Sequence, residues 1–79
     1  MEARVSVTLK NGVLDPQGKA IGDALQSLAF QHVQSIRQGK VFHIILDDMP
    51  KEKAHEQLTM MCEQLLANTV IENYHIDIL

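Results

Sequence analysis

The C-terminal third of the chain carries the pattern that constrains the fold most. Apolar residues there first recur at intervals of three and four positions, as on one face of a helix, at Leu58, Met61 and Leu65. They then recur at every second position, as in a strand, at Tyr74, Ile76 and Ile78. Asn68 lies between the two patterns, and asparagine tolerates the left-handed conformation in which many helices end. The change predicts a helix that ends near residue 68 and a strand over about 71–78.

The N-terminal half predicts a strand followed by a helix. Residues 2–10 alternate between polar and apolar side chains, which is typical of a strand with one solvated face. Asp15 and Pro16 form a helix start, with a capping carboxylate followed by proline at the first helical position. The helix pattern fades near residue 31, and its apolar stripe is predicted to pack on a sheet: Ala20, Ile21, Ala24, Leu25 and Leu28.

The middle of the chain predicts a β-hairpin and a second helix. A short mixed segment at 33–37 precedes Gln38-Gly39-Lys40, where the glycine favours a tight reversal, and an apolar run follows at 41–46. Pro50 then suits the opening position of a helix that extends to about Ala67. The predicted order is strand, helix, strand, strand, helix, strand, within one domain over residues 1–79. This is the ferredoxin-like split βαβ arrangement of the α+β class, an antiparallel sheet of strand order 4-1-3-2 with two helices on one face.

The strand at 41–46 predicts a contact surface, because it is apolar on both faces. Val41 and Ile45 lie on the face that the two helices cannot cover, although an incidental apolar pair on a central strand is the alternative. A domain of 79 residues buries only about three fifths of its unfolded surface. We therefore expect a homodimer or tetramer, with Val41 and Ile45 as candidate self-association residues.

Composition restricts the partners and the compartment. The formal net charge is −3 and no basic run is present, which argues against nucleic acid as a partner. No apolar stretch is long enough to span a bilayer, and no charged segment followed by an apolar run begins the sequence. These features predict a soluble cytoplasmic protein with no membrane partner.

The residues that usually carry chemistry form no recognisable site. The four histidines form no closely spaced pair with another ligand residue, so no metal site is predicted. Cys62 has no neighbouring cation to lower its pKa and is interpreted as structural. Gly12 and Gly18 fit neither a P-loop nor a dinucleotide fingerprint. The sequence thus predicts no catalytic, metal or cofactor site. An alternative function that agrees with this pattern is an oligomeric regulatory domain of the same fold that senses a small ligand between subunits.

Three sequence blocks resemble one family. Leu-Asp-Pro-Gln-Gly at 14–18, Arg-Gln-Gly-Lys at 37–40 and Leu-Leu-Ala-Asn-Thr-Val-Ile-Glu at 65–72, in this order, resemble the PurS family, the small subunit of phosphoribosylformylglycinamidine synthase. The resemblance covers nearly the whole chain. One departure is Ala29, where the family often has glycine, which predicts a different helix exit.

The resemblance implies a role in purine biosynthesis. In the divided enzyme, a large synthetase subunit uses ATP and magnesium to convert formylglycinamide ribonucleotide to formylglycinamidine ribonucleotide, with ammonia that a glutaminase subunit releases from glutamine. The small subunit joins the two, has no active site and binds no cofactor of its own. Carried onto this sequence, the family blocks give six candidate partner contacts: Gln17, Gly18, Arg37, Gly39, Lys40 and Thr69.

Overall fold

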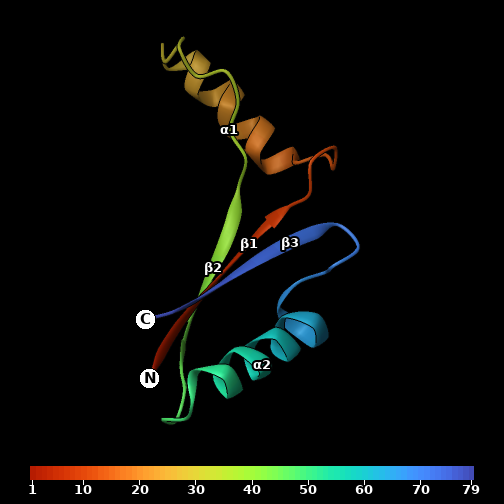
Figure 1. The fold of residues 1–79 in the computed structure, drawn as a ribbon. Helices are drawn as coiled ribbons and strands as arrows, with labels where there is room; N and C mark the ends of the chain where they lie inside the picture. Colours follow the sequence, from red (N-terminus) through yellow and green to blue (C-terminus); the bar gives the residue numbers. More distant parts are fainter.

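The computed structural model describes all residues, Met1–Leu79, and consists of a sheet lobe and a projecting arm (Figure 1). The lobe contains strands β1 (Glu2–Leu9), β2 (Gly39–Ile45) and β3 (Glu72–Ile78), with helix α2 (Lys51–Met61) on one face. The arm contains helix α1 (Pro16–Ser27) and the segment 30–38, which returns beside it to the sheet. The element order is therefore β-α-β-α-β.

The sheet is antiparallel, with strand order β2-β1-β3. Central strand β1 alternates as predicted, with Ala3, Val5 and Val7 buried and the residues between them turned to the other face. The observed order agrees with the predicted 4-1-3-2 except that the second predicted strand is missing. Both β2 and β3 thus have an unpaired outer edge.

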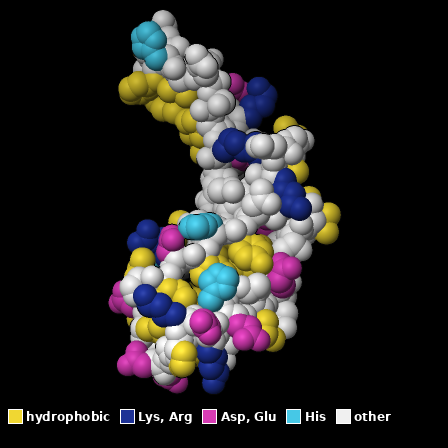
Figure 2. All heavy atoms as spheres, viewed as in Figure 1, with side chains coloured by type: hydrophobic (Ala, Val, Ile, Leu, Met, Phe, Trp, Pro, Cys, Tyr) yellow, Lys and Arg dark blue, Asp and Glu magenta, His cyan; other side chains and the backbone are white.

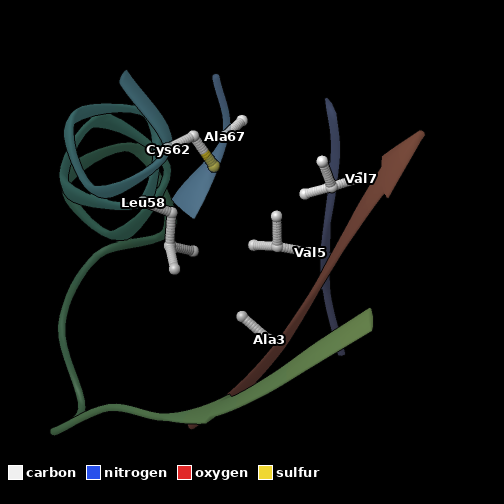
Figure 3. Close-up of a cluster of buried hydrophobic side chains, with 6 residues drawn as sticks. All are labelled: Ala3, Val5, Val7, Leu58, Cys62 and Ala67. Carbon is white, nitrogen blue, oxygen red and sulfur yellow. The ribbon is translucent and has the colours of Figure 1, made fainter. Parts of the chain in front are cut away.

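The core lies entirely within the sheet lobe. Side chains from β1 meet side chains from α2 and the segment after it, in a buried cluster of Ala3, Val5, Val7, Leu58, Cys62 and Ala67 (Figure 3). Phe42, Ile44, Tyr74 and Ile76 extend this cluster from the two outer strands but are only partly buried. The arm contributes no residue to this core.

A single π-helical turn, η1 (Cys62–Leu66), ends α2 and decides which side chains reach the core. It closes with a hydrogen bond from the Ala67 N–H to the Cys62 carbonyl oxygen at 3.0 Å. The five-residue step keeps Ala67 on the buried side and turns Leu65 outward, where it is 83% exposed. The helical spacing in the sequence places Leu65 on the same face as Leu58, and the wider turn explains the difference.

The predicted β-hairpin at 33–46 is wrong. Residues 33–38 form no strand, and Gly39 is the first residue of β2, paired with Thr8, instead of the centre of a reversal. Its φ is not positive, since Gly12 is the only glycine with positive φ. The chain therefore runs straight from the arm into the lobe.

The prediction that α1 packs on the sheet is also wrong for this chain. The helix begins at Pro16 as predicted and ends at Ser27, but only Gly18 among its residues is buried. The expected pair of helices on one face of the sheet is thus reduced to α2 alone. The apolar stripe of α1 faces away from its own core.

Both helix exits differ from the sequence-based expectation. Ala29 adopts φ of 74°, the left-handed conformation that glycine would favour, and the Phe30 N–H bonds to the Leu25 carbonyl oxygen at 3.0 Å. The exit of α1 is therefore an ordinary left-handed cap made with alanine. Asn68 is not left-handed; its carbonyl oxygen accepts from the Ile71 and Glu72 N–H groups and organises the turn before β3.

Candidate functional site

Asp15 links the arm to the lobe through two backbone hydrogen bonds. Its Oδ1 accepts from the Gly18 N–H at 2.9 Å, which caps α1, and its Oδ2 accepts from the Gln38 N–H at 2.8 Å, just before β2. These bonds, the one from Gln38 first and the one from Gly18 second, hold the pKa of the Asp15 carboxyl below its usual value. Burial acts against them, and the nearby Arg37 guanidinium lowers the pKa by the smallest amount. The ionised carboxylate fixes both ends of the arm at one point.

Arg37 strengthens the same junction. Its Nη2 donates to the carbonyl oxygens of Leu9 at 3.1 Å and Lys10 at 2.9 Å, where β1 ends. A charged donor that bridges two backbone carbonyls is a strong form of hydrogen bond. We call Asp15, Arg37 and the backbone groups they bond the hinge. The sequence-based role of Arg37 as a partner contact stays a prediction, and the structure adds this role within the chain.

The glycines of the two family blocks permit close backbone approach at the hinge. A Cβ atom at Gly18 would lie 2.6 Å from the Ile36 carbonyl oxygen, and one at Gly39 would lie 2.6 Å from the Val7 carbonyl oxygen. Neither position has room for a side chain without moving the backbone. The role of Gly18 as a partner contact stays a prediction, and within the chain it is residue 36 that approaches this glycine.

Five of the six candidate contacts gather around the hinge. Gln17, Gly39 and Lys40 line a polar hollow of about 250 Å³, together with Asp15 and Glu72. Gly18 and Arg37 line the adjoining groove of about 550 Å³ between α1 and segment 33–37. The Lys40 Nζ also lies 5.6 Å from the centre of the Phe42 ring, which fixes this cation beside β2.

Thr69, the sixth candidate, lies apart from the hinge. It borders a small hollow beyond the end of η1, with Lys10, Glu63 and Tyr74 around it. Burial is the main cause that raises the pKa of the Tyr74 hydroxyl, and the nearby Glu63 carboxylate adds to it. The hollow therefore presents a protonated phenol beside exposed polar groups, a surface suited to hydrogen bonding.

The uncovered face of the sheet carries the predicted self-association residues. Val41 is 52% exposed and Ile45 is 82% exposed, with His43 between them on the same strand. On the far side of β1, His75 Nε2 lies 3.0 Å from the Asp77 carboxylate, an exposed pair. This face thus combines apolar side chains along β2 with polar ones along β3.

The groups that could carry chemistry are dispersed or buried. Cys62 lies in the core, where burial first and the Glu63 carboxylate second raise the pKa of its thiol. No group of three or more His, Cys, Asp and Glu side chains is close enough to hold a metal ion. Neither helix has the length and apolar character needed to cross a membrane. The notable features of the surface are therefore its hinge, grooves and exposed apolar residues.

Sequence reasoning missed one large feature, the uncovered apolar side of the arm. Leu28 is 68% exposed and Phe30 is 55% exposed, and Ile21 is also exposed. Figure 2 shows hydrophobic side chains gathered along one side of the arm. The signal was present in the helical spacing of the stripe, but periodicity does not reveal which surface covers it.

Comparison with known proteins points to one family over the whole chain. The family model described as PurS, phosphoribosylformylglycinamidine (FGAM) synthase, matches residues 2–79. The phosphoribosylformylglycinamidine synthase subunit PurS of Synechocystis is 47% identical over 75 residues, which are 95% of this chain and 75% of the relative. The subunit of the same name from Bacillus subtilis is 42% identical and covers 98% of this chain and 90% of its own.

Solved structures agree with these matches. Bacillus subtilis PurS superposes with a TM-score of 0.86 at 41% identity, covering 96% of this chain and 94% of that one. A chain in the structure of PurLQS from Thermotoga maritima superposes with a TM-score of 0.89 at 33% identity, covering 99% of this chain and 95% of that one. The agreement includes the elongated shape, because a single TM-score spans both lobe and arm.

Proposed function

The chain belongs to the PurS family, whose curated members are subunits of phosphoribosylformylglycinamidine synthase, and we propose that within this enzyme it is a scaffold that joins the other subunits. The reaction of the enzyme is the ATP- and glutamine-dependent conversion of formylglycinamide ribonucleotide to formylglycinamidine ribonucleotide in purine biosynthesis. The observation that carries the proposal is the match to a chain of Thermotoga maritima PurLQS over 99% of this sequence.

Two solved relatives supply the pathway and the assembly. The Methanocaldococcus jannaschii relative is described as one of the subunits of formylglycinamide ribonucleotide amidotransferase in the purine biosynthetic pathway, and it superposes with a TM-score of 0.87. The Thermotoga maritima structure is described as PurLQS. By this likeness the proposed partners are a large synthetase subunit, a glutaminase subunit and further copies of this chain.

We propose that the chain contributes surfaces and no active site. A nucleophile or general base needs an accessible group with an adjusted pKa, and the one thiol, Cys62, is buried and held protonated. The ATP and magnesium of the reaction would belong to the synthetase subunit, with no cofactor bound by this chain. The candidate contacts fall into four surfaces: the hinge hollow with Gln17, Gly39 and Lys40, the adjoining groove with Gly18 and Arg37, the hollow at Thr69, and the open sheet face with Val41 and Ile45.

The test measures turnover of formylglycinamide ribonucleotide by purified synthetase and glutaminase subunits, with ATP and magnesium, in the presence and absence of this chain. A coupling scaffold makes glutamine-dependent turnover depend on the chain, while turnover with free ammonia proceeds without it. Equal glutamine-dependent rates with and without the chain would overturn the proposal. Turnover with neither nitrogen source unless the chain is added would instead assign it a role in the synthetase reaction itself.

A further inference from the structure

The turn between β1 and α1 places an asparagine directly before a glycine. Asn11 and Gly12 are the two central residues of this turn, which closes with a hydrogen bond from the Val13 N–H to the Lys10 carbonyl oxygen at 3.2 Å. Gly12 has φ of 85° and Asn11 has no positive φ, the combination that a type II turn requires. Both residues are exposed, and a Cβ atom at Gly12 would meet no heavy atom within 4 Å. The space around their peptide bond is therefore open.

The peptide group between Asn11 and Gly12 makes no hydrogen bond within the chain. The Gly12 N–H has no acceptor, the Asn11 carbonyl oxygen has no donor, and the Asn11 side chain is also unbonded. An unbonded peptide group can rotate without breaking a hydrogen bond, and glycine allows rotations that other residues resist. The amide nitrogen of Gly12 is therefore free to approach the side chain of Asn11.

We propose that Asn11 is a site of spontaneous covalent modification, in which its side chain reacts with the backbone of Gly12. The Gly12 amide nitrogen attacks Cγ of Asn11, and the bond from Cγ to the side-chain nitrogen breaks. That nitrogen takes up the proton of the Gly12 amide and leaves as ammonia, so that a succinimide ring remains. Water then adds to either carbonyl of the ring and opens it. The products are an ordinary aspartate and an isoaspartate, in which the main chain runs through the former side chain.

The other two asparagines are held in ways that oppose the same reaction. Asn68 precedes a β-branched residue, and its Oδ1 accepts from the Val70 N–H at 3.2 Å. Asn73 precedes an aromatic residue and lies within β3, where it pairs with Thr8. In both cases the attacking nitrogen belongs to a residue with a bulky side chain, and Asn73 is also fixed in an extended conformation. The structure thus assigns the reaction to Asn11.

Isoaspartate at residue 11 would disturb the hinge. It adds a main-chain carbon atom to the turn that the Val13 N–H closes on the Lys10 carbonyl oxygen, and the same oxygen accepts from Arg37 Nη2 at 2.9 Å. The new carboxylate also lies one residue from this oxygen and competes with it for the Arg37 guanidinium, because a charged acceptor makes the stronger bond. Modification therefore weakens the link between the arm and the end of β1. This inference is independent of the proposed function.

Isotope labelling tests the reaction in the folded chain. The full chain is incubated at mildly alkaline pH, below its melting temperature, in water enriched in heavy oxygen, and is then digested with trypsin in ordinary water. Heavy oxygen enters only where the amide was lost before digestion, so deamidation during the digestion is not counted. Trypsin leaves Asn11 in the peptide 11–19 and the other two asparagines in the peptide 54–79. Mass spectrometry measures the label in each peptide, and thermal melting of the undigested chain follows the hinge.

We expect heavy oxygen to accumulate in peptide 11–19 and not in peptide 54–79, while the melting temperature of the chain falls. The control is Asn11→Ser, which cannot form the ring and should keep its initial melting temperature through the same incubation. Equal label in the two peptides, or label in neither, would overturn the proposal. Label that persists in peptide 11–19 of the Asn11→Ser variant would come from Gln17 and would overturn the assignment. A labelled chain with an unchanged melting temperature would overturn the effect on the hinge. The turnover assay tests the proposed function separately, so the two proposals fail independently.

Discussion

The lobe and the arm both carry apolar residues at regular spacing, but only the lobe buries them. In the lobe, Val5, Val7 and Leu58 are completely buried within one chain. In the arm, the stripe that includes Ile21 and Leu28 has the same periodic spacing and remains exposed. Helical periodicity therefore predicts that a face will be covered and does not specify by which chain. The lobe should owe its stability to its own core, and the arm to another molecule.

The largest expected effect separates the two regions by stability. Leu58→Ala removes a completely buried side chain from the lobe core and should lower the free energy of unfolding by about 2–5 kcal/mol. Leu65→Ala, the same substitution at an exposed position about two turns further along, should change it by less than about 0.5 kcal/mol. Urea unfolding followed by circular dichroism measures both. Similar losses in the two variants would mean that the π-helical turn does not direct Leu65 outward in solution.

A charge on the arm should break assembly without unfolding the lobe. Leu28→Asp would place an unpaired carboxylate on the exposed apolar stripe of α1, and should weaken self-association through the arm by about 100-fold or more. Sedimentation equilibrium measures the dissociation constant. Ser27→Asp is the control, because it adds the same charge at the same end of α1 but on the polar side of the helix. Both variants carry the same unfavourable interaction with the helix dipole, but Ser27→Asp should leave the dimer intact. A dimer unaffected by Leu28→Asp would place the interface elsewhere.

The hinge between the two regions should respond to acid. The folded pKa of Asp15 is lowered, so the stabilisation from its ionised form is present above its unfolded pKa of about 3.9 and is lost as pH falls through the lower folded value. The amide of the Asp15→Asn variant has one acceptor oxygen, whereas the carboxylate uses two. The melting temperature of this variant at neutral pH should therefore be a few degrees lower than that of the unmodified chain. Its melting temperature should then fall less than that of the unmodified chain below about pH 4. Parallel acid profiles of the two proteins would contradict the hinge role of the carboxylate.

The sequence predicted most strands and helices well because the patterns that mark them are local. Alternation along β1 and β3, proline at the start of α1 and the position of α2 all follow from short-range rules that the structure confirms. The strand at 33–37 was wrong because Gly39 satisfies a reversal and a straight strand equally well. What decides between them is the set of three bonds from residues 37 and 38 to Leu9, Lys10 and Asp15, and such long-range contacts leave no periodic signal.

The sequence marked positions of the candidate site without giving their role within the chain. The family blocks name Gly18, Arg37 and Gly39 as partner contacts, which stays a prediction, and the structure places all three at the hinge. The structure finds the approaching groups within the chain, at the hinge. Some residues keep the arm extended, and the position of the arm determines which surfaces a partner can meet. A motif can therefore be required for assembly without contacting the partner. For Lys40 and Thr69, distinguishing a role within the chain from a contact with a partner requires binding measurements with the partner subunits.

The smallest expected effect is at the far end of the arm, where α1 ends. Ala29 adopts φ of 74°, a conformation that costs an alanine about 1 kcal/mol and a glycine almost nothing. Ala29→Gly should therefore raise the free energy of unfolding, by about 1 kcal/mol at most because glycine also gains entropy in the unfolded chain. Ala24→Gly, the same substitution inside α1, should lower it by about 0.5–1 kcal/mol. Opposite signs in thermal melting would show that the arm is folded and contributes to stability. If both variants melt like the unmodified chain, the arm unfolds independently of the lobe, and the contrast between the two regions extends to their stability.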